Sequence, residues 1–183
     1  MLNFNPFPEI KTDRLLLRRI EISDGDMILF LRSDKTVTKF IERPESRQTK
    51  NMADAIKFIN ELDGYFETNK SISWGITLKN ESKIIGTICL WNFSENNKIA
   101  EVGYDLDPKF QGNGFMNESL KAIVSFGFNK LDLGKIEAFT HQENENSKRL
   151  LEKNGFKFNA DRVDEENILN VIYELESKIN HSH

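Results

Sequence analysis

The amino-acid sequence predicts an α+β fold with three layers, in which helices cover both faces of a mixed, partly antiparallel sheet. Apolar residues with strand-like and helix-like spacing follow one another in the order β-α-α-β-β-β-α-β-α-β-β. Mixed connections of this kind favour a sheet with both parallel and antiparallel neighbours. The 183 residues contain no linker and no internal repeat. We therefore expect one domain over residues 11–176, between a lead-in (1–10) and a tail (177–183).

The N-terminal half is expected to supply three strands and two helices. Its predicted elements are a strand at 14–20, a short helix after an N-cap at Ser23-Asp24, a longer helix at 49–66, and strands at 73–78 and 84–93. A break at Arg43-Pro44 separates the two helices, and the polar turn 79–83 joins the last two strands.

The C-terminal half begins with a strand at 99–106, which Asp107-Pro108 closes. A helix follows, because apolar residues recur at Met116, Leu120, Ile123 and Val124. The remaining predicted elements are a strand at 136–141, a short helix that starts near residue 147 and ends at Gly155, and a hairpin of strands 157–163 and 168–175.

The segment Gln111-Gly112-Asn113-Gly114-Phe115-Met116 joins a predicted strand to a predicted helix through two glycines. Such a helix start leaves several backbone N–H groups free, and these favour a phosphate or pyrophosphate. No Gly-Lys-Ser/Thr follows, so a Walker A loop is excluded, and Asn117 stands where a dinucleotide fingerprint needs glycine. A tight turn without a ligand remains the alternative.

Three segments in order carry a resemblance to a known family. They are Lys11–Arg19, the Q-x-x-G stretch 111–114, and the N-x-x-S stretch that begins at Asn144 and continues to Phe156. Together they resemble the GNAT superfamily of acyl-CoA-dependent N-acyltransferases, in its RimJ/RimL-type branch. The resemblance implies a GNAT-like fold and acetyl transfer from acetyl-CoA to a primary amine, by direct attack in a ternary complex. The acceptor would be a protein N-terminus or a small amine.

The resemblance also implies which residues bind acetyl-CoA. Loop amides would hold the pyrophosphate, backbone groups near Leu106 would pair with the pantetheine arm, and a backbone N–H near Val102 would polarise the thioester carbonyl. The full implied set is Leu106, Gln111, Gly112, Asn113, Gly114, Met116, Asn144 and Ser147. Met116 departs from the family, which usually has glycine or alanine there, and its bulk could narrow the loop. Asn144 could instead be only a helix cap.

Glu101 is the predicted general base, because most amines are protonated at neutral pH and must lose a proton. Strand alternation places it opposite Ala100 and Val102, beside Gly103. Glu137 on the next strand is a lesser candidate, and a merely exposed glutamate is the competing interpretation. Many GNAT enzymes use a tyrosine as general acid where this chain has Leu151. The RimJ/RimL-type branch often has a serine at the position of Ser147, which could stabilise or protonate the leaving thiolate, or only cap the helix.

Bulk properties limit the classes of function. A formal net charge of −4 argues against a broad nucleic-acid-binding face. No apolar run is long enough to cross a bilayer, and no cysteine–histidine pattern predicts a metal site. The lone Cys89 agrees with a reducing cytoplasm. We expect a small-molecule or peptide amine as partner, selected by the two early helices, the loop at residues 40–44 and the late hairpin. A non-catalytic acyl-CoA-binding module is the alternative, and oligomeric state is not encoded in any motif.

Overall fold

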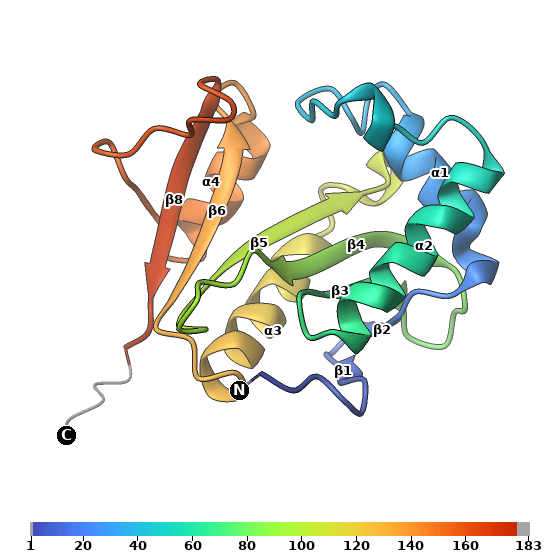
Figure 1. Ribbon diagram of the computed structural model, residues 1–183, viewed down its shortest axis with the longest axis horizontal. Helices are drawn as coiled ribbons and strands as arrows, with labels where there is room; N and C mark the ends of the chain where they lie inside the picture. Colours follow the sequence, from blue (N-terminus) through green and yellow to red (C-terminus); the bar gives the residue numbers. More distant parts are fainter. Residues whose placement is uncertain (1, 179–183) are drawn as a thin grey trace.

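The computed structural model describes residues 2–178, and in that range the strands form one eight-stranded sheet in the order β1-β2-β3-β4-β5-β6-β8-β7. Helices α1 and α2 cover one face, while α3 and α4 lie against the other (Figure 1). The strands are β1 (Ile10–Lys11), β2 (Leu15–Arg19), β3 (Ile72–Leu78), β4 (Ile84–Trp91), β5 (Ile99–Leu106), β6 (Lys135–His141), β7 (Lys157–Phe158) and β8 (Asn170–Glu176). The helices are α1 (Gly25–Ser33), α2 (Met52–Glu67), α3 (Phe115–Asn129) and α4 (Glu145–Lys153). This arrangement confirms the predicted α+β class.

The late hairpin is the element whose length differs most from its prediction. Its first strand, β7, ends at Phe158 instead of continuing to Val163. The Asn159 N–H still donates to Ile172 O at 2.8 Å, but the Asn159 side chain then accepts from the N–H of Asp161 at 3.0 Å. An asparagine that bonds its own backbone two residues on forms a turn, which ends the strand.

Strands β5 and β6 are parallel neighbours that separate along their length. Their paired residues run from Ile99 opposite Lys135 to Glu101 opposite Glu137. Beyond Glu101 the strands diverge, and β6 continues with β8 as its antiparallel partner (Figure 1). The edge of β5 that faces β6 is therefore without a strand partner from residue 102 to residue 106 within the described chain.

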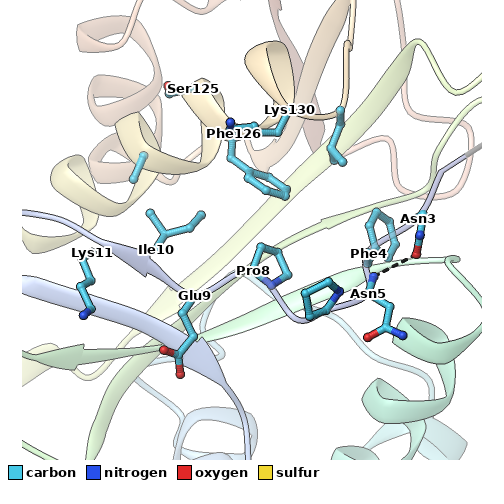
Figure 2. Close-up of a pocket in the computed structure, with 13 residues that line it drawn as sticks. Asn3, Phe4, Asn5, Pro8, Glu9, Ile10, Lys11, Ser125, Phe126 and Lys130 are labelled. Atoms are coloured by element: carbon cyan, nitrogen blue, oxygen red, sulfur yellow. Dashed lines mark hydrogen bonds between the residues drawn. The ribbon is translucent and has the colours of Figure 1, made fainter.

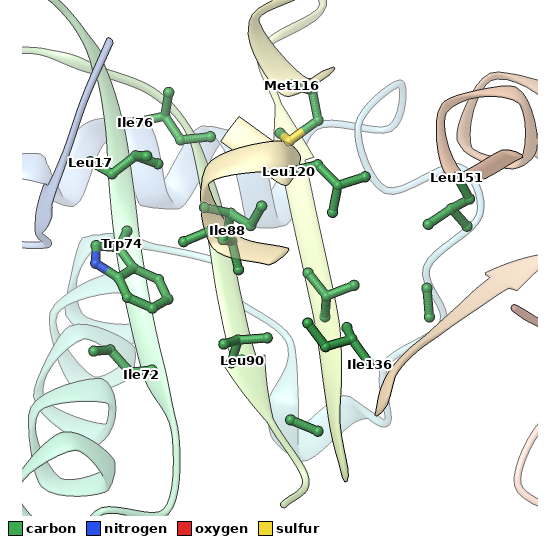
Figure 3. Packing of buried hydrophobic residues seen from close by; sticks show 14 of the residues in the cluster. Leu17, Ile72, Trp74, Ile76, Ile88, Leu90, Met116, Leu120, Ile136 and Leu151 are labelled. Carbon is green, nitrogen blue, oxygen red and sulfur yellow. The ribbon is translucent and has the colours of Figure 1, made fainter. Parts of the chain in front are cut away.

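The larger hydrophobic core fills the space between the sheet and helices α3 and α4. Figure 3 shows Leu120 of α3 near Ile88 of β4, and both residues are fully buried. Leu151 of α4 belongs to the same cluster and is 0% exposed. A smaller cluster under α1 and α2 consists of Ile20, Ile28, Ala55, Ile59 and Ile84. Burying each such aliphatic side chain contributes about 1.5–3 kcal/mol, so both helical layers are held mainly by apolar contact.

The N-terminal segment packs on the domain. Phe4 is 2% exposed, and its ring lies 5.7 Å from that of Phe93. The fully buried Trp74 donates its indole N–H to Pro8 O at 2.8 Å. The expected lead-in at residues 1–10 thus contributes to the core over its described part. Residues 179–183 of the expected tail lie outside the described residues.

Candidate active site

The loop before α3 has the conformation that its glycines allow. Gly112 and Gly114 have φ angles of 77° and 78°, which residues with a Cβ rarely adopt. Gly114 is the N-cap of α3, and the first helical bond of the loop runs from Glu118 N to Gly114 O at 3.0 Å. The backbone N–H groups of the first turn therefore have no carbonyl partner inside the helix. The N–H of Gln111 is already used, since it donates to Pro108 O at 3.2 Å.

Met116 does not cover this loop with its side chain. Met116 is 8% exposed, and its side chain points into the core beside Leu120 (Figure 3). Residues 111–114 are all exposed. The loop therefore stays open despite the methionine at a position where the family usually has a smaller residue.

Arg14 and Glu118 fasten the loop to the start of β2. The Glu118 carboxylate accepts from Arg14 Nε at 2.7 Å, from the Arg14 N–H at 2.8 Å and from Thr12 Oγ1 at 2.6 Å. The guanidinium also donates to Asn113 O at 2.9 Å. A Cβ on Gly114 would lie 3.4 Å from Arg14 Nη2. Exposed amides next to a guanidinium suit an anionic ligand.

Glu101 lies in a row of three carboxylates across neighbouring strands. Glu101 is opposite Glu137 on β6, and Glu137 is opposite Glu174 on β8. Arg162 binds the other two members of the row, with Nη1 at 2.5 Å from Glu137 Oε1 and in contact with Glu174. Among the described residues Glu101 has no ion-pair partner, and its carboxylate accepts only a long bond of 3.4 Å from Asn92 Nδ2.

The two candidate bases, Glu101 and Glu137, differ in the charges and burial around their carboxylates. Burial raises the pKa of Glu101 to about 7, with further increases from the charges of Asp164, Glu137 and Glu166. A carboxylate that ionises near neutral pH can take up a proton at the pH of the cell. The carboxylate of Glu137 is instead neutralised by Arg162. The geometry therefore favours Glu101 over Glu137.

Tyr104 and Ser147 meet on the opposite face of β5. The phenol oxygen of Tyr104 lies 2.8 Å from Ser147 Oγ, and burial raises the pKa of Tyr104 to about 12. The N–H of Ser147 donates to Asn144 Oδ1 at 3.2 Å, so Asn144 caps α4 in this structure. The sequence prediction did not include Tyr104. Strand alternation puts Tyr104 on the same face as Ala100 and Val102, but it does not reveal the partner, which is 43 residues away.

Asp105 lies on the same face of β5 as Glu101, near the loop between α1 and α2. It accepts from Thr87 Oγ1 at 2.6 Å, and burial raises its pKa, opposed by Thr87 and the positive charges of Arg43 and Arg32. The ring of Phe40 lies 5.1 Å from that of His141 at the end of β6. We call the side of β4 and β5 that carries Thr87, Cys89, Trp91, Glu101, Gly103 and Asp105 the acceptor face.

A pocket of about 480 Å³ lies elsewhere, between the N-terminal segment and the second half of α3. Figure 2 shows Phe4, Pro8 and Ile10 on one side and Phe126 and Lys130 on the other. None of the predicted site residues lines it. The described residues contain no group of His, Cys, Asp and Glu that could hold a metal ion. No helix in the described part of the chain is long and apolar enough to cross a membrane.

A family model described as an acetyltransferase (GNAT) domain matches residues 14–157. The chain belongs to the GNAT acetyltransferase family. It is 35% identical over 153 residues to the uncharacterized N-acetyltransferase YoaA of Bacillus subtilis (strain 168), covering 82% of this chain and 84% of that protein. It is 30% identical over 76 residues to the ribosomal-protein-serine acetyltransferase of Escherichia coli (strain K12), covering 42% of each chain.

The solved structures agree on the GNAT fold. RimL, a ribosomal alpha-N-protein acetyltransferase in complex with coenzyme A, superposes with a TM-score of 0.78 over 92% of this chain and 98% of that chain. Its sequence identity is 19%, so this likeness concerns the fold. The predicted family and its RimL-like relatives are confirmed, and the chain is an acetyltransferase of the GNAT class.

Proposed function

We propose that this acetyltransferase transfers acetyl from acetyl-CoA to a primary amine by direct attack in a ternary complex. The observation that supports this proposal most is that β5, where it separates from β6, carries different functional groups on its two faces. One face presents Glu101, whose pKa is about 7, and the other presents the Tyr104–Ser147 pair. A base and a hydrogen-bond donor on either side of an open strand edge are the two groups that aminolysis of a thioester requires.

The donor would be held mostly by backbone groups. We assign the pyrophosphate to the loop of Gln111, Gly112, Asn113, Gly114 and Met116, and the pantetheine arm to the open β5 edge near Leu106, with Asn144 and Ser147 beside it. The exposed amides, the positive φ angles of the glycines and the neighbouring Arg14 support this assignment. Bound acetyl-CoA supplies an activated acetyl thioester.

In the proposed reaction Glu101 accepts a proton from the attacking amine, directly or through one water molecule. A backbone N–H near Val102 stabilises the negative charge that develops on the carbonyl oxygen. Ser147 donates a hydrogen bond to the leaving sulfur. A carboxylate with a pKa near 7 is matched to this task, because about half of it is ionised at neutral pH and the ionised form is a stronger base than an ordinary carboxylate.

The acceptor class is the amine of a small molecule or of a peptide N-terminus. The negative charges of Asp164 and Glu166 act on Glu101 of the acceptor face, and this grouping of carboxylates suits a cationic amine. We place the reaction in the cytoplasm, in keeping with the single cysteine of the chain.

Release of free thiol from acetyl-CoA with a panel of amines tests the proposal. We expect saturable release with at least one amine, and Glu101→Gln should lower kcat at least tenfold, since general base catalysis contributes about 10²–10⁴-fold. Glu137→Gln is the matched control, since it changes the neighbouring carboxylate in the same row, and it should retain most activity. Tight CoA binding without release for any amine would instead support a non-catalytic acyl-CoA-binding module.

A further inference from the structure

We propose that Tyr104 is a positioning residue for Ser147. Its phenol donates a hydrogen bond to Ser147 Oγ, and this directs the serine hydrogen toward the leaving sulfur of the acyl donor. This inference rests on the proposed function. Many GNAT enzymes use a tyrosine on α4 as general acid, and this chain has the buried Leu151 there, so Tyr104 would supply a phenol to the site from β5 instead.

The pair bridges two elements at the place where the donor thioester would lie. Tyr104 is on β5, three residues beyond the last pair with β6, and Ser147 is in the first turn of α4. The bond of 2.8 Å therefore crosses the side of the sheet where β5 has lost its neighbour. The backbone of Ser147 is fixed by the Asn144 cap, so the orientation of its hydroxyl is decided by its side-chain partner.

The direction of the hydrogen bond follows from the chemistry of both groups. Either oxygen could donate when the site is free of ligand. A serine hydroxyl has one hydrogen. If that hydrogen is donated to a sulfur anion while the bond to Tyr104 is kept, the tyrosine must be the donor in that bond. Burial keeps the phenol protonated, with its pKa near 12, far above that of an ordinary thiol. Tyr104 is thus a permanent donor and a poor source of protons.

This assigns a limited role to the pair in the bond-breaking step. As the C–S bond of the thioester breaks, its electron pair moves to sulfur, and the Ser147 hydroxyl stabilises that charge without losing its hydrogen. The proton that finally neutralises the thiolate comes from water. The Tyr104–Ser147 bond restricts the Ser147 hydroxyl to the orientation that this contact requires.

A purely structural link between β5 and α4 is the competing role, and the chain offers a matched control for it. Tyr173 on β8 also bonds its hydroxyl to α4, at 2.8 Å from Glu152 Oε1, and it is 2% exposed. Tyr173→Phe therefore removes the same kind of strand-to-α4 bond outside the proposed site. Tyr104→Phe and Tyr173→Phe should have similar thermal stability.

The experiment is a double-mutant cycle of Tyr104→Phe and Ser147→Ala, measured with the best amine of the panel. We expect Tyr104→Phe to lower kcat about tenfold, the size of one hydrogen bond, with little change in KM for acetyl-CoA. In the Ser147→Ala background the same change should have almost no effect. The activity of Tyr173→Phe should match that of the wild type. A kcat of Tyr104→Phe equal to that of Tyr173→Phe, or an undiminished loss in the Ser147→Ala background, would overturn the proposal.

A binding measurement keeps the test independent of turnover. CoA and desulfo-CoA are titrated into the wild-type protein at neutral pH and again above the pKa of the thiol. The wild-type protein should bind CoA more tightly as the thiol ionises, and Tyr104→Phe should lose this gain, while desulfo-CoA shows none. If no amine supports thiol release, the proposed reaction fails, but this titration still decides whether the pair recognises a thiolate.

Discussion

Replacing Glu101 by glutamine should make the protein more stable at alkaline pH. Glutamine has nearly the shape of glutamate and keeps a carbonyl oxygen for the bond that Asn92 Nδ2 donates at 3.4 Å. It lacks the charge that burial on the acceptor face disfavours. This prediction concerns folding alone, so it holds whichever amine is the acceptor.

The sign and size follow from the pKa of Glu101 in the folded and unfolded states. Folding raises this pKa from 4.5 to about 7. A raised pKa gives a contribution to stability that is complete below the unfolded value and disappears as the pH rises through the folded value. Since one pKa unit corresponds to about 1.36 kcal/mol, the ionised carboxylate costs the wild-type protein up to roughly 3 kcal/mol above pH 8. Glu101→Gln removes this cost.

Urea denaturation at two pH values measures the effect. At about pH 8.5 Glu101→Gln should unfold at a higher urea concentration than the wild type, and at about pH 4.5 the two should coincide. Glu137→Gln is the control of opposite sign, because it breaks the ion pair with Arg162 and should lose up to about 1 kcal/mol at the higher pH. Equal stability of Glu101→Gln and the wild type at both pH values would refute the assigned pKa.

Two further substitutions test the loop and the fold separately. Gly114→Ala forces a Cβ into a backbone with φ of 78°, which costs about 1–2 kcal/mol. Calorimetry should show weaker CoA binding by this variant. Gly64→Ala is the control, because a Cβ at Gly64 on α2 meets open space, and it should leave CoA binding unchanged. Asp24→Asn leaves the charge of Arg18 unpaired in a bridge whose side chains are 15% and 5% exposed; we expect a loss of about 3–5 kcal/mol in urea denaturation, with unchanged CoA affinity.

The elements of the fold could be predicted because they depend on local spacing. The segment from Gln111 to Met116 leads from β5 into the first turn of α3 as expected, since its glycines and the apolar residues after it act within a few positions. The packing of Phe4 was missed because its ring contacts, Phe66 and Phe93, are far away in the sequence. The short β1 was missed for another reason: two residues are too few to show a period, and only its pairing with β2 defines it.

The candidate site shows the same limit at the level of side chains. Strand alternation placed Glu101 away from the core, and the structure agrees. Glu101 has no cationic partner among the described residues, because Arg162, in the loop after β7, binds Glu137 and Glu174 instead. That arrangement requires β8 to lie next to β6, and the spacing of apolar residues along the sequence does not predict this strand order. The bond between Tyr104 and Ser147 likewise depends on how α4 packs against the sheet.

The alternation of β5 explains how one strand can serve both halves of the proposed reaction. Glu101 ionises near neutral pH, so a carboxylate on the same side as the leaving sulfur would repel the thiolate as it forms. Residues one position apart on a strand point to opposite faces. Glu101 therefore faces the acceptor side, while Tyr104, three positions later, faces α4 and brings a neutral donor to Ser147. In the proposed reaction, the pleat of β5 would thus place the base near the amine and the hydrogen-bond donors near the sulfur, without any additional element of structure.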